Sequence, residues 1–207
     1  MSKRTLVIVA AVAALTLGGV PAGAQAAKKK PKTPAAWTKA QKDAKTLFAV
    51  LRRAAKPADT LPHTKGKPAP SPPVVGARYL GTLSGNKAYL SLQGPNVCLT
   101  ITYQSGSATG GACIPVADVK SGKRLPQALQ LGVSSVSFFI AVPDGATVAR
   151  TISGTATPQP VTNNAALLST TANGTVDVTL ANGKVVTARL GFAVPPPAST
   201  PAPATGY

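Results

Sequence analysis

The chain has 207 residues, with 22 Lys and Arg against five Asp and no Glu, and a formal net charge of +17. One histidine, two cysteines and five carboxylates exclude the usual zinc ligand sets and leave little material for acid–base catalysis. The length suits one domain with flanking segments.

Residues 1–26 have the pattern of a cleavable signal peptide. Basic residues at positions 3 and 4 precede an apolar run over 6–15, and the small residues of Ala-Gln-Ala at 24–26 provide a cleavage site. The run is shorter than the ~20 residues that span a bilayer, which favours cleavage over a permanent anchor. We therefore expect a secreted protein, extracellular or retained in the cell envelope.

Residues 27–32 are a lysine run that we expect to be disordered, and residues 33–56 have the pattern of an amphipathic helix. Thr33 is the expected N-cap, Pro34 suits the first helical position, and Pro57 ends the pattern. The apolar stripe either covers the next domain or lies on a membrane surface, and its high Ala content favours the first. The stripe consists of Trp37, Ala40, Ala44, Leu47, Phe48, Leu51 and Ala55.

The basic region is a candidate for contact with anionic partners, because residues 28–67 hold twelve Lys and Arg against two Asp. In an exported protein the expected partner is an anionic membrane surface or a cell-wall polymer. Specific nucleic-acid binding is not indicated, because only Trp37 and Phe48 supply aromatic rings here and no nucleic-acid motif is present. The candidate contact residues are Lys28, Lys29, Lys30, Lys39, Lys42, Lys45, Arg52 and Arg53.

The rest of the chain divides into three segments. Residues 57–73 are a Pro-rich linker, and residues 195–207 are a Pro/Ala/Thr-rich tail that we expect to be disordered. Residues 74–194 have short apolar or alternating runs separated by turn residues, which is typical of an all-β domain. The expected fold is a small antiparallel β-sandwich or open barrel, preceded by one amphipathic α-helix and flanked by disordered termini.

Two turns predict particular strand pairings. Pro-Asp-Gly at 143–145 suits a three-residue hairpin loop with a left-handed glycine, and Ala-Asn-Gly at 181–183 suits the same loop. A two-residue loop at the second turn would shift the register by one and turn apolar side chains to the wrong face. The expected pairs are Ile140 with Val148 and Val136 with Ile152 at the first turn, and Val178 with Val186 and Val176 with Ala188 at the second.

Cys98 and Cys113 are an even pair in a chain expected to enter an oxidising compartment, which favours a disulfide. Residues 97–103 alternate as in a strand, and folding back around Gly106 pairs the two cysteines directly across strands. The alternative, a reactive thiol, would call for a low-pKa environment or a C-x-x-C spacing, and neither is visible. The same register pairs Leu99 with Ala112 and Ile101 with Gly110.

The catalytic candidates are few. His63 lies in the linker, where it cannot be held within reach of a nucleophile, and we expect it to be solvated. Asp144 belongs to a turn, Asp177 points outward from a strand, and Asp118 is expected in a polar loop. A Ser–Lys dyad stays open, because both residue types are common. We expect no enzyme, no cofactor and no metal, and the sequence identifies no small-molecule ligand.

Several short motifs follow one another in a recognisable order: residues 48–54 (Phe-Ala-Val-Leu-Arg-Arg-Ala), Asp-Thr-Leu-Pro at 59–62, two cysteines about fifteen residues apart, Val-Pro-Asp-Gly at 142–145, and Asn163-Asn164. This order resembles that of a loosely defined group of uncharacterised secreted proteins from actinobacteria. The resemblance covers most of residues 47–190. It implies export and a similar architecture, and it implies no activity or site.

The leading hypothesis is a secreted or envelope-associated protein without catalytic activity, built around a disulfide-bearing β domain. The first alternative is a cationic module that binds anionic lipid or cell-wall polymer through the lysines of 28–56. The second is a hydrolase whose site has no recognisable motif.

Overall fold

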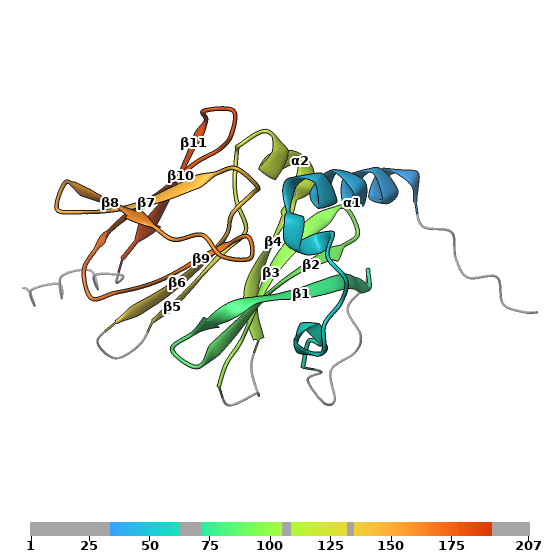
Figure 1. Cartoon of the computed structure of the whole chain (residues 1–207), viewed down its shortest axis with the longest axis horizontal. Coiled ribbons are helices and arrows are strands. Elements are labelled where there is room, and N and C mark those ends of the chain that lie inside the picture. The colour runs from blue at the N-terminus through green and yellow to red at the C-terminus, as the bar shows by residue number, and fades with distance from the viewer. Residues whose placement is uncertain (1–33, 63–71, 105–108, 132–134, 192–207) are drawn as a thin grey trace, which may run out of the picture. The chain divides into compact units, whose positions relative to one another are not determined.

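A computed structural model describes residues 34–62, 72–104, 109–131 and 135–191, drawn in colour in Figure 1. The expected signal peptide, lysine run and C-terminal tail lie outside the described residues, as do His63 and most of the linker. The helices are α1 (Ala35–Leu47), the 3-10 helices η1 (Ala49–Leu51) and η2 (Pro57–Asp59), and α2 (Val116–Lys120). The strands are β1 (Val74–Leu83), β2 (Asn86–Gln93), β3 (Asn96–Thr102), β4 (Thr109–Pro115), β5 (Gln127–Leu131), β6 (Val136–Ala141), β7 (Thr147–Ile152), β8 (Thr155–Gln159), β9 (Ala165–Thr170), β10 (Gly174–Thr179) and β11 (Val185–Leu190).

The strands form three antiparallel sheets with the orders β1-β2-β3-β4, β5-β6-β9 and β11-β10-β7-β8. The first two sheets adjoin at both edges, where β4 lies beside β5 and β1 beside β9. At the second of these edges a Cβ on Gly81 would lie 2.7 Å from Leu167 Cδ1, so the glycine lets the two strands approach. The expected antiparallel sandwich or open barrel is confirmed, with one main helix on its N-terminal side.

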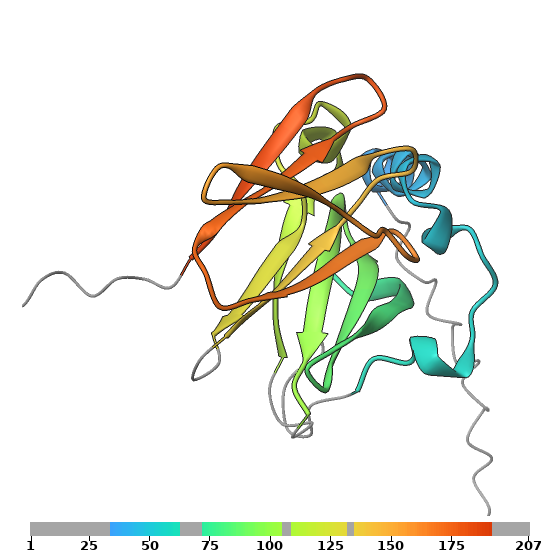
Figure 2. The ribbon, with the colours of Figure 1, turned by 60° about the vertical axis from the view of Figure 1, so that its left-hand side comes forward.

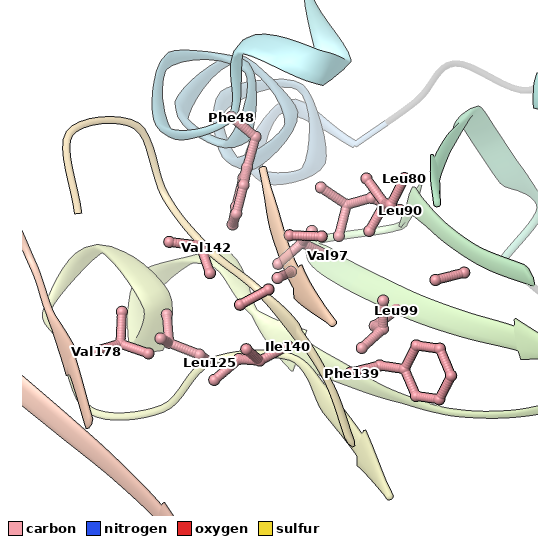
Figure 3. Packing of buried hydrophobic residues seen from close by; sticks show 14 of the residues in the cluster. Phe48, Leu80, Leu90, Val97, Leu99, Leu125, Phe139, Ile140, Val142 and Val178 are labelled. Atoms are coloured by element: carbon pink, nitrogen blue, oxygen red, sulfur yellow. The ribbon is translucent and has the colours of Figure 1, made fainter. Parts of the chain in front are cut away.

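One hydrophobic core joins the three sheets and the helical segment. Phe48, Leu90, Val97 and Ile140 are fully buried and belong to a single cluster of apolar side chains. Figure 3 shows Phe48 extending from the helical segment into the group formed by the sheet residues. Burying a side chain of this size contributes about 1.5–3 kcal/mol, so the segment before β1 is an integral part of the domain.

Helix α1 is shorter than the sequence predicts. It begins at Ala35 after Pro34 and ends at Leu47, whereas the apolar stripe predicted a helix over 33–56. Phe48 has φ −130° and ψ 107°, an extended conformation that breaks the helix. The stripe itself is buried only in part: Ala44 and Phe48 are inaccessible, and Ala55 is exposed. Figures 1 and 2 show α1 beside α2, at one end of the first sheet.

The predicted linker over 57–73 contains ordered structure at its start. Residues 57–59 form η2, and the side chain of Asp59 is buried there. Strand β1 begins at Val74, where the sequence predicts that the β domain begins. Ordered structure therefore extends into the start of the predicted linker, and residues 63–71 lie outside the described residues.

The hairpin predicted at 181–183 is confirmed. Strands β10 and β11 pair Val178 with Val186 and Val176 with Ala188, and Gly183 has φ +80°. The amide of Leu180 donates to the carbonyl of Lys184 at 2.8 Å, which closes the three-residue loop.

The hairpin predicted at 143–145 is wrong, although the turn exists. Gly145 has φ +72°, and the Ala146 amide donates to the Pro143 carbonyl at 3.2 Å. The strands on either side nevertheless lie in different sheets, because β6 pairs with β5 and β9 while β7 pairs with β8 and β10. Ile140 therefore faces Gln127 and Ala166 across its two ladders instead of Val148.

Candidate functional site

Helix α1 presents lysines on the side opposite the core. Lys39, Lys42 and Lys45 are exposed, whereas Ala44 on the inner side is inaccessible. At 100° per residue, the three lysines fall within an arc of about 120° centred roughly opposite Ala44. We call these three residues the lysine face.

Two contacts hold the inner side of α1 against the sheet. Trp37 is half-buried next to Gly94, where an added Cβ would come within 3.5 Å of its ring. Gln41 donates from Nε2 to the Gly94 carbonyl at 3.4 Å. The lysine face is therefore carried by a helix with a fixed orientation on the domain.

The C-terminal end of α1 is capped by groups from elsewhere in the chain. The Asp144 amide donates to the Leu47 carbonyl at 2.8 Å. The Arg52 guanidinium donates to the Lys45 carbonyl at 2.7 Å and to Asp144 Oδ2 at 2.9 Å. A cation and an amide thus satisfy carbonyls that the end of a helix leaves free.

The residues after α1 bind to two polar side chains of the β domain. The Ala49 amide donates to Asp144 Oδ1 at 3.0 Å, and the Val50 amide donates to Asn164 Oδ1 at 2.8 Å. Asn164 in turn donates from Nδ2 to Asp144 Oδ1 at 2.7 Å and to the Val142 carbonyl at 3.0 Å. We call residues 47–52, Asp144 and Asn164 the helix-end cluster.

These contacts lower the pKa of Asp144. Burial alone would raise it, but the hydrogen bonds from Asn164, from the Ala49 amide and from Arg52 favour the carboxylate and prevail. The role assigned to Asp144 from the sequence, a turn residue, is therefore incomplete. Its carboxylate also fixes the segment that follows α1.

A second anchor joins Arg53 and Asp59. The guanidinium binds the carboxylate in a bidentate pair, with both N–O distances 2.7 Å, and the Asp59 side chain is only 4% exposed. The amides of Tyr79 and Lys56 also donate to this carboxylate at 2.7 Å. The Arg53 hydrogen bonds, aided by these two amides, hold the pKa of Asp59 well below its usual range despite its burial.

The candidate anion-contacting residues therefore separate into three groups. Lys28, Lys29 and Lys30 lie outside the described residues. Lys39, Lys42 and Lys45 are together on one helix and exposed. Arg52 and Arg53 pair with Asp144 and Asp59, and these pairs anchor the helical segment.

A cation that the sequence did not single out lies next to the lysine face. Lys120 of α2 pairs with Asp43 at 3.5 Å, and its side chain is 60% exposed. Lys39 and Lys120 border a groove of about 400 Å³ between α1 and α2, floored by small apolar side chains. Its basic character was not visible in the sequence, because α2 is a five-residue helix that follows β4 directly and has no pattern of its own.

The remaining carboxylates also have partners. Asp118 lies in α2, where a polar loop was expected, and its hydrogen bond from Arg124 lowers its pKa. Asp177 accepts a hydrogen bond from the Thr187 hydroxyl at 2.6 Å, across the β10–β11 ladder. No group of three His, Cys, Asp or Glu able to hold a metal occurs among the described residues.

The two cysteines form a disulfide between β3 and β4. Cys98 pairs with Cys113 in the ladder, with Cα atoms 4.0 Å apart, and the neighbouring pairs are Leu99 with Ala112 and Ile101 with Gly110. The predicted register is confirmed at every one of these positions. Cys98 is buried and Cys113 is exposed, so the bond lies at the surface of the first sheet.

No protein-family model matches the sequence, and it matches no curated protein and no solved structure. The interpretation of the lysine face therefore rests on its own geometry. No helix in the described part of the chain is long and apolar enough to cross a membrane.

Proposed function

We propose that this chain is an exported protein, without catalytic activity, that binds a phosphate-bearing surface of the cell envelope through its lysine face. The observation that carries the proposal is the mounting of α1: its inner side is buried in the core, and Lys39, Lys42 and Lys45 are exposed on the opposite side. A docked helix keeps these three charges together, so that binding carries no further cost for ordering the backbone.

Export is supported by the signal-like pattern of residues 1–26 and by the disulfide, which is typical of oxidising compartments. Mass spectrometry of the chain produced with its own N-terminus tests this directly. We expect a product that begins after residue 26, with no free thiol. A product that retains residues 1–26 would contradict export by this route.

The expected strength of binding follows from the charges. A Lys close to an anionic membrane surface contributes about 1 kcal/mol, and the attraction decays within a Debye length. Removing two of the three lysines should therefore weaken binding by about 2 kcal/mol, roughly 30-fold. Lipid headgroups and wall polymers share the phosphate chemistry, so the experiment has to separate them.

The test compares Lys39→Gln/Lys42→Gln with Lys87→Gln/Arg189→Gln, which removes the same charge from exposed positions on β2 and β11. Each protein is sedimented at low and at physiological salt with phosphatidylglycerol vesicles, with phosphatidylcholine vesicles and with purified cell wall. We expect binding to at least one of the anionic materials, no binding to phosphatidylcholine, and a loss in the α1 variant only. Equal loss in both variants, or no binding at low salt, would overturn the proposal.

The non-catalytic part is supported by the partners of all five Asp, each of which takes part in an ion pair or hydrogen bond within the domain. A general acid or base acts within hydrogen-bond reach of a bound substrate, and none of the five carboxylates lines the cavity between the first two sheets. A screen against ester, amide, glycoside and phosphoester substrates tests this. A robust activity that Asp177→Asn abolishes while the fold is retained would contradict it.

We propose further that the resemblance to secreted actinobacterial proteins reflects the anchoring of α1. The motifs at 48–54, 59–62, 142–145 and 163–164 are distant in the sequence, and they supply the helix-end cluster and the Arg53–Asp59 pair. Proteins with the same motifs would then hold the helix on the β domain through the same contacts.

A further inference from the structure

A cavity of about 260 Å³ lies between the first two sheets, at the end of β3 and β4 that is remote from α1. Its walls come from the end of β3, the start of β4, strand β5 and one residue of β6. Ile101 and Phe139 are almost completely buried and provide an apolar base. The cavity is distinct from the lysine face in position and in chemistry.

None of the residues that line the cavity carries a charge, in a chain with a formal net charge of +17. The lining residues with polar side chains are Tyr103, Gln127 and Gln130, and the backbone of Gly110, Gly111 and the edge strand β5 lines it as well. A charged ligand would be desolvated there without an opposite charge to compensate, which is costly. The lining therefore suits an uncharged ligand that has both apolar and hydrogen-bonding edges.

The orientation of the Gln130 carboxamide follows from a chain of hydrogen bonds. The backbone N–H of Gln104 can only donate. The side-chain atom of Asn86 that it contacts at 3.1 Å is therefore the carboxamide oxygen. The other Asn86 atom is then the NH₂ group, and it donates to Gln130 Oε1 at 2.6 Å. Asn86 is only 4% exposed, which makes this arrangement rigid. Gln130 consequently offers its own NH₂ group to a ligand as a donor.

The opposite wall is formed by an aromatic ring beside two glycines. Tyr103 is half-buried, and a Cβ on Gly110 would lie 2.9 Å from its hydroxyl oxygen. A larger residue at this position would therefore displace the phenol. Glycine at 110 leaves room for the ring of Tyr103 at the edge of the cavity, where its flat apolar face can meet a ligand.

We propose that this cavity binds a single uncharged saccharide ring, such as a neutral sugar unit of an envelope polymer. A pyranose has an apolar C–H face that suits Tyr103, and its hydroxyls can accept from the Gln130 NH₂ group and exchange hydrogen bonds with the unpaired backbone of the edge strand β5. The proposal goes beyond the proposed function and is independent of it, because no residue of the lysine face lines the cavity.

The test is a titration followed by ¹H–¹⁵N NMR with methyl glucoside, methyl galactoside and N-acetylglucosamine as probes. Glucuronate and uridine are the charged and the nucleobase-bearing counterparts. We expect saturable shifts at the Gln130 side-chain NH₂ and at the Gly110 and Ala128 amides for at least one neutral sugar, with a Kd of about 1–10 mM. The Lys39→Gln/Lys42→Gln variant should bind the sugar unchanged, so failure of the two proposals can be told apart.

The decisive variant is Gln130→Glu, because a carboxylate still accepts from Asn86 but no longer donates to a ligand. We expect the affinity of this variant for the sugar to fall at least about tenfold, because the sugar hydroxyl that accepted from the Gln130 NH₂ group loses its donor. Gln159→Glu on β8 adds the same charge away from the cavity and should bind as the parent does. Ala128→Leu, which fills the cavity, should abolish binding.

Four results would overturn the proposal. They are no shift at these residues with about 50 mM of any neutral sugar, tighter binding of glucuronate, shifts from uridine alone, and equal weakening by Gln130→Glu and Gln159→Glu.

Discussion

Asn164 donates a hydrogen bond to Asp144 at 2.7 Å, and through this contact two turns of the β domain meet at the end of α1. The backbone N–H of Val50 donates to one atom of the Asn164 carboxamide, which must therefore be the oxygen. The other atom is the NH₂ group, and it donates to Asp144. Asn163 and Asn164 both have left-handed backbone conformations, with φ +50° and +60°. They form the tight turn closed by the Thr162–Ala165 bridge, which asparagine tolerates better than most residues.

Replacing Asn164 should therefore destabilise the domain. Asn164→Gly keeps the backbone conformation and removes three side-chain hydrogen bonds, so we expect a loss of about 2–4 kcal/mol in the free energy of unfolding. Asn164→Ala should lose about 1 kcal/mol more, because alanine disfavours the left-handed region. Urea denaturation followed by tryptophan fluorescence measures both. Asn163→Gly is the control: it removes a single long hydrogen bond, from Nδ2 to the Leu80 carbonyl at 3.4 Å, and should cost much less. If it matches Asn164→Gly, the three Asn164 hydrogen bonds are not the cause.

The buried ion pair predicts a second effect. Asp59→Asn leaves the Arg53 guanidinium without its counter-charge, and we expect a loss of about 2–4 kcal/mol in the free energy of unfolding. Asp43→Asn removes a carboxylate from the exposed pair with Lys120 and should change stability by less than about 0.5 kcal/mol. Similar losses in the two variants would contradict the anchoring role of Asp59.

Stability should also depend on pH in the acid range. The pKa values of Asp59 and Asp144 are lower in the folded protein than in the unfolded chain, where the pKa of Asp is about 3.9. Below that pH the unfolded chain takes up protons first, so the free energy of unfolding should fall from about pH 4 downwards and be constant above about pH 5. Denaturation curves across this range test the prediction, and Asp59→Asn should flatten the dependence. An unchanged slope in the variant would assign the effect to other carboxylates.

Breaking the disulfide should destabilise the domain, although the folded protein should keep the same strand pairing. The cysteines enclose a loop with a sequence separation of 15 residues, for which the chain-entropy model gives roughly 3 kcal/mol. Denaturation with and without reductant, beside a Cys98→Ala/Cys113→Ala variant, measures this. Reductant should have no effect on the variant; an effect there would show that the loss in the parent has another source.

Two aromatic residues of the helical segment should differ in their importance. Phe48 is inaccessible, so Phe48→Ala should lower the free energy of unfolding by about 3–5 kcal/mol. Trp37 is half-buried at the edge of the sheet, and Trp37→Ala should cost clearly less. Thermal unfolding followed by circular dichroism compares them. Equal losses would mean that the segment after α1 is not anchored mainly by Phe48.

The parts of the fold that could be predicted from the sequence depend on neighbours in the chain. The disulfide register and the β10–β11 hairpin each join adjacent strands through a turn whose residues set the geometry. The turn at 143–145 has the same local signals, and its glycine adopts the expected conformation. The two strands that flank this turn, β6 and β7, pair with other strands in different sheets. Which strands pair over long distances cannot be read from the residues of the turn.

The end of α1 could not be predicted for a similar reason. The apolar stripe continues past Leu47, but the amides of Ala49 and Val50 bind acceptors that lie 95 and 114 residues away in the sequence. In the same region Arg52 pairs with Asp144, a contact that the sequence also does not show. The exposure of Lys39, Lys42 and Lys45 agrees with the predicted helix face, because this part of the helix follows its own periodicity.

The cross-strand disulfide has a consequence for what happens when a protease cuts the chain. A single cut of the backbone between Cys98 and Cys113 would leave both fragments covalently joined, and each cut end would still be held by its half of the β3–β4 ladder. Such a nicked molecule would run as two pieces only after reduction. The two fragments would therefore stay in one molecule, with the core and the helix in place.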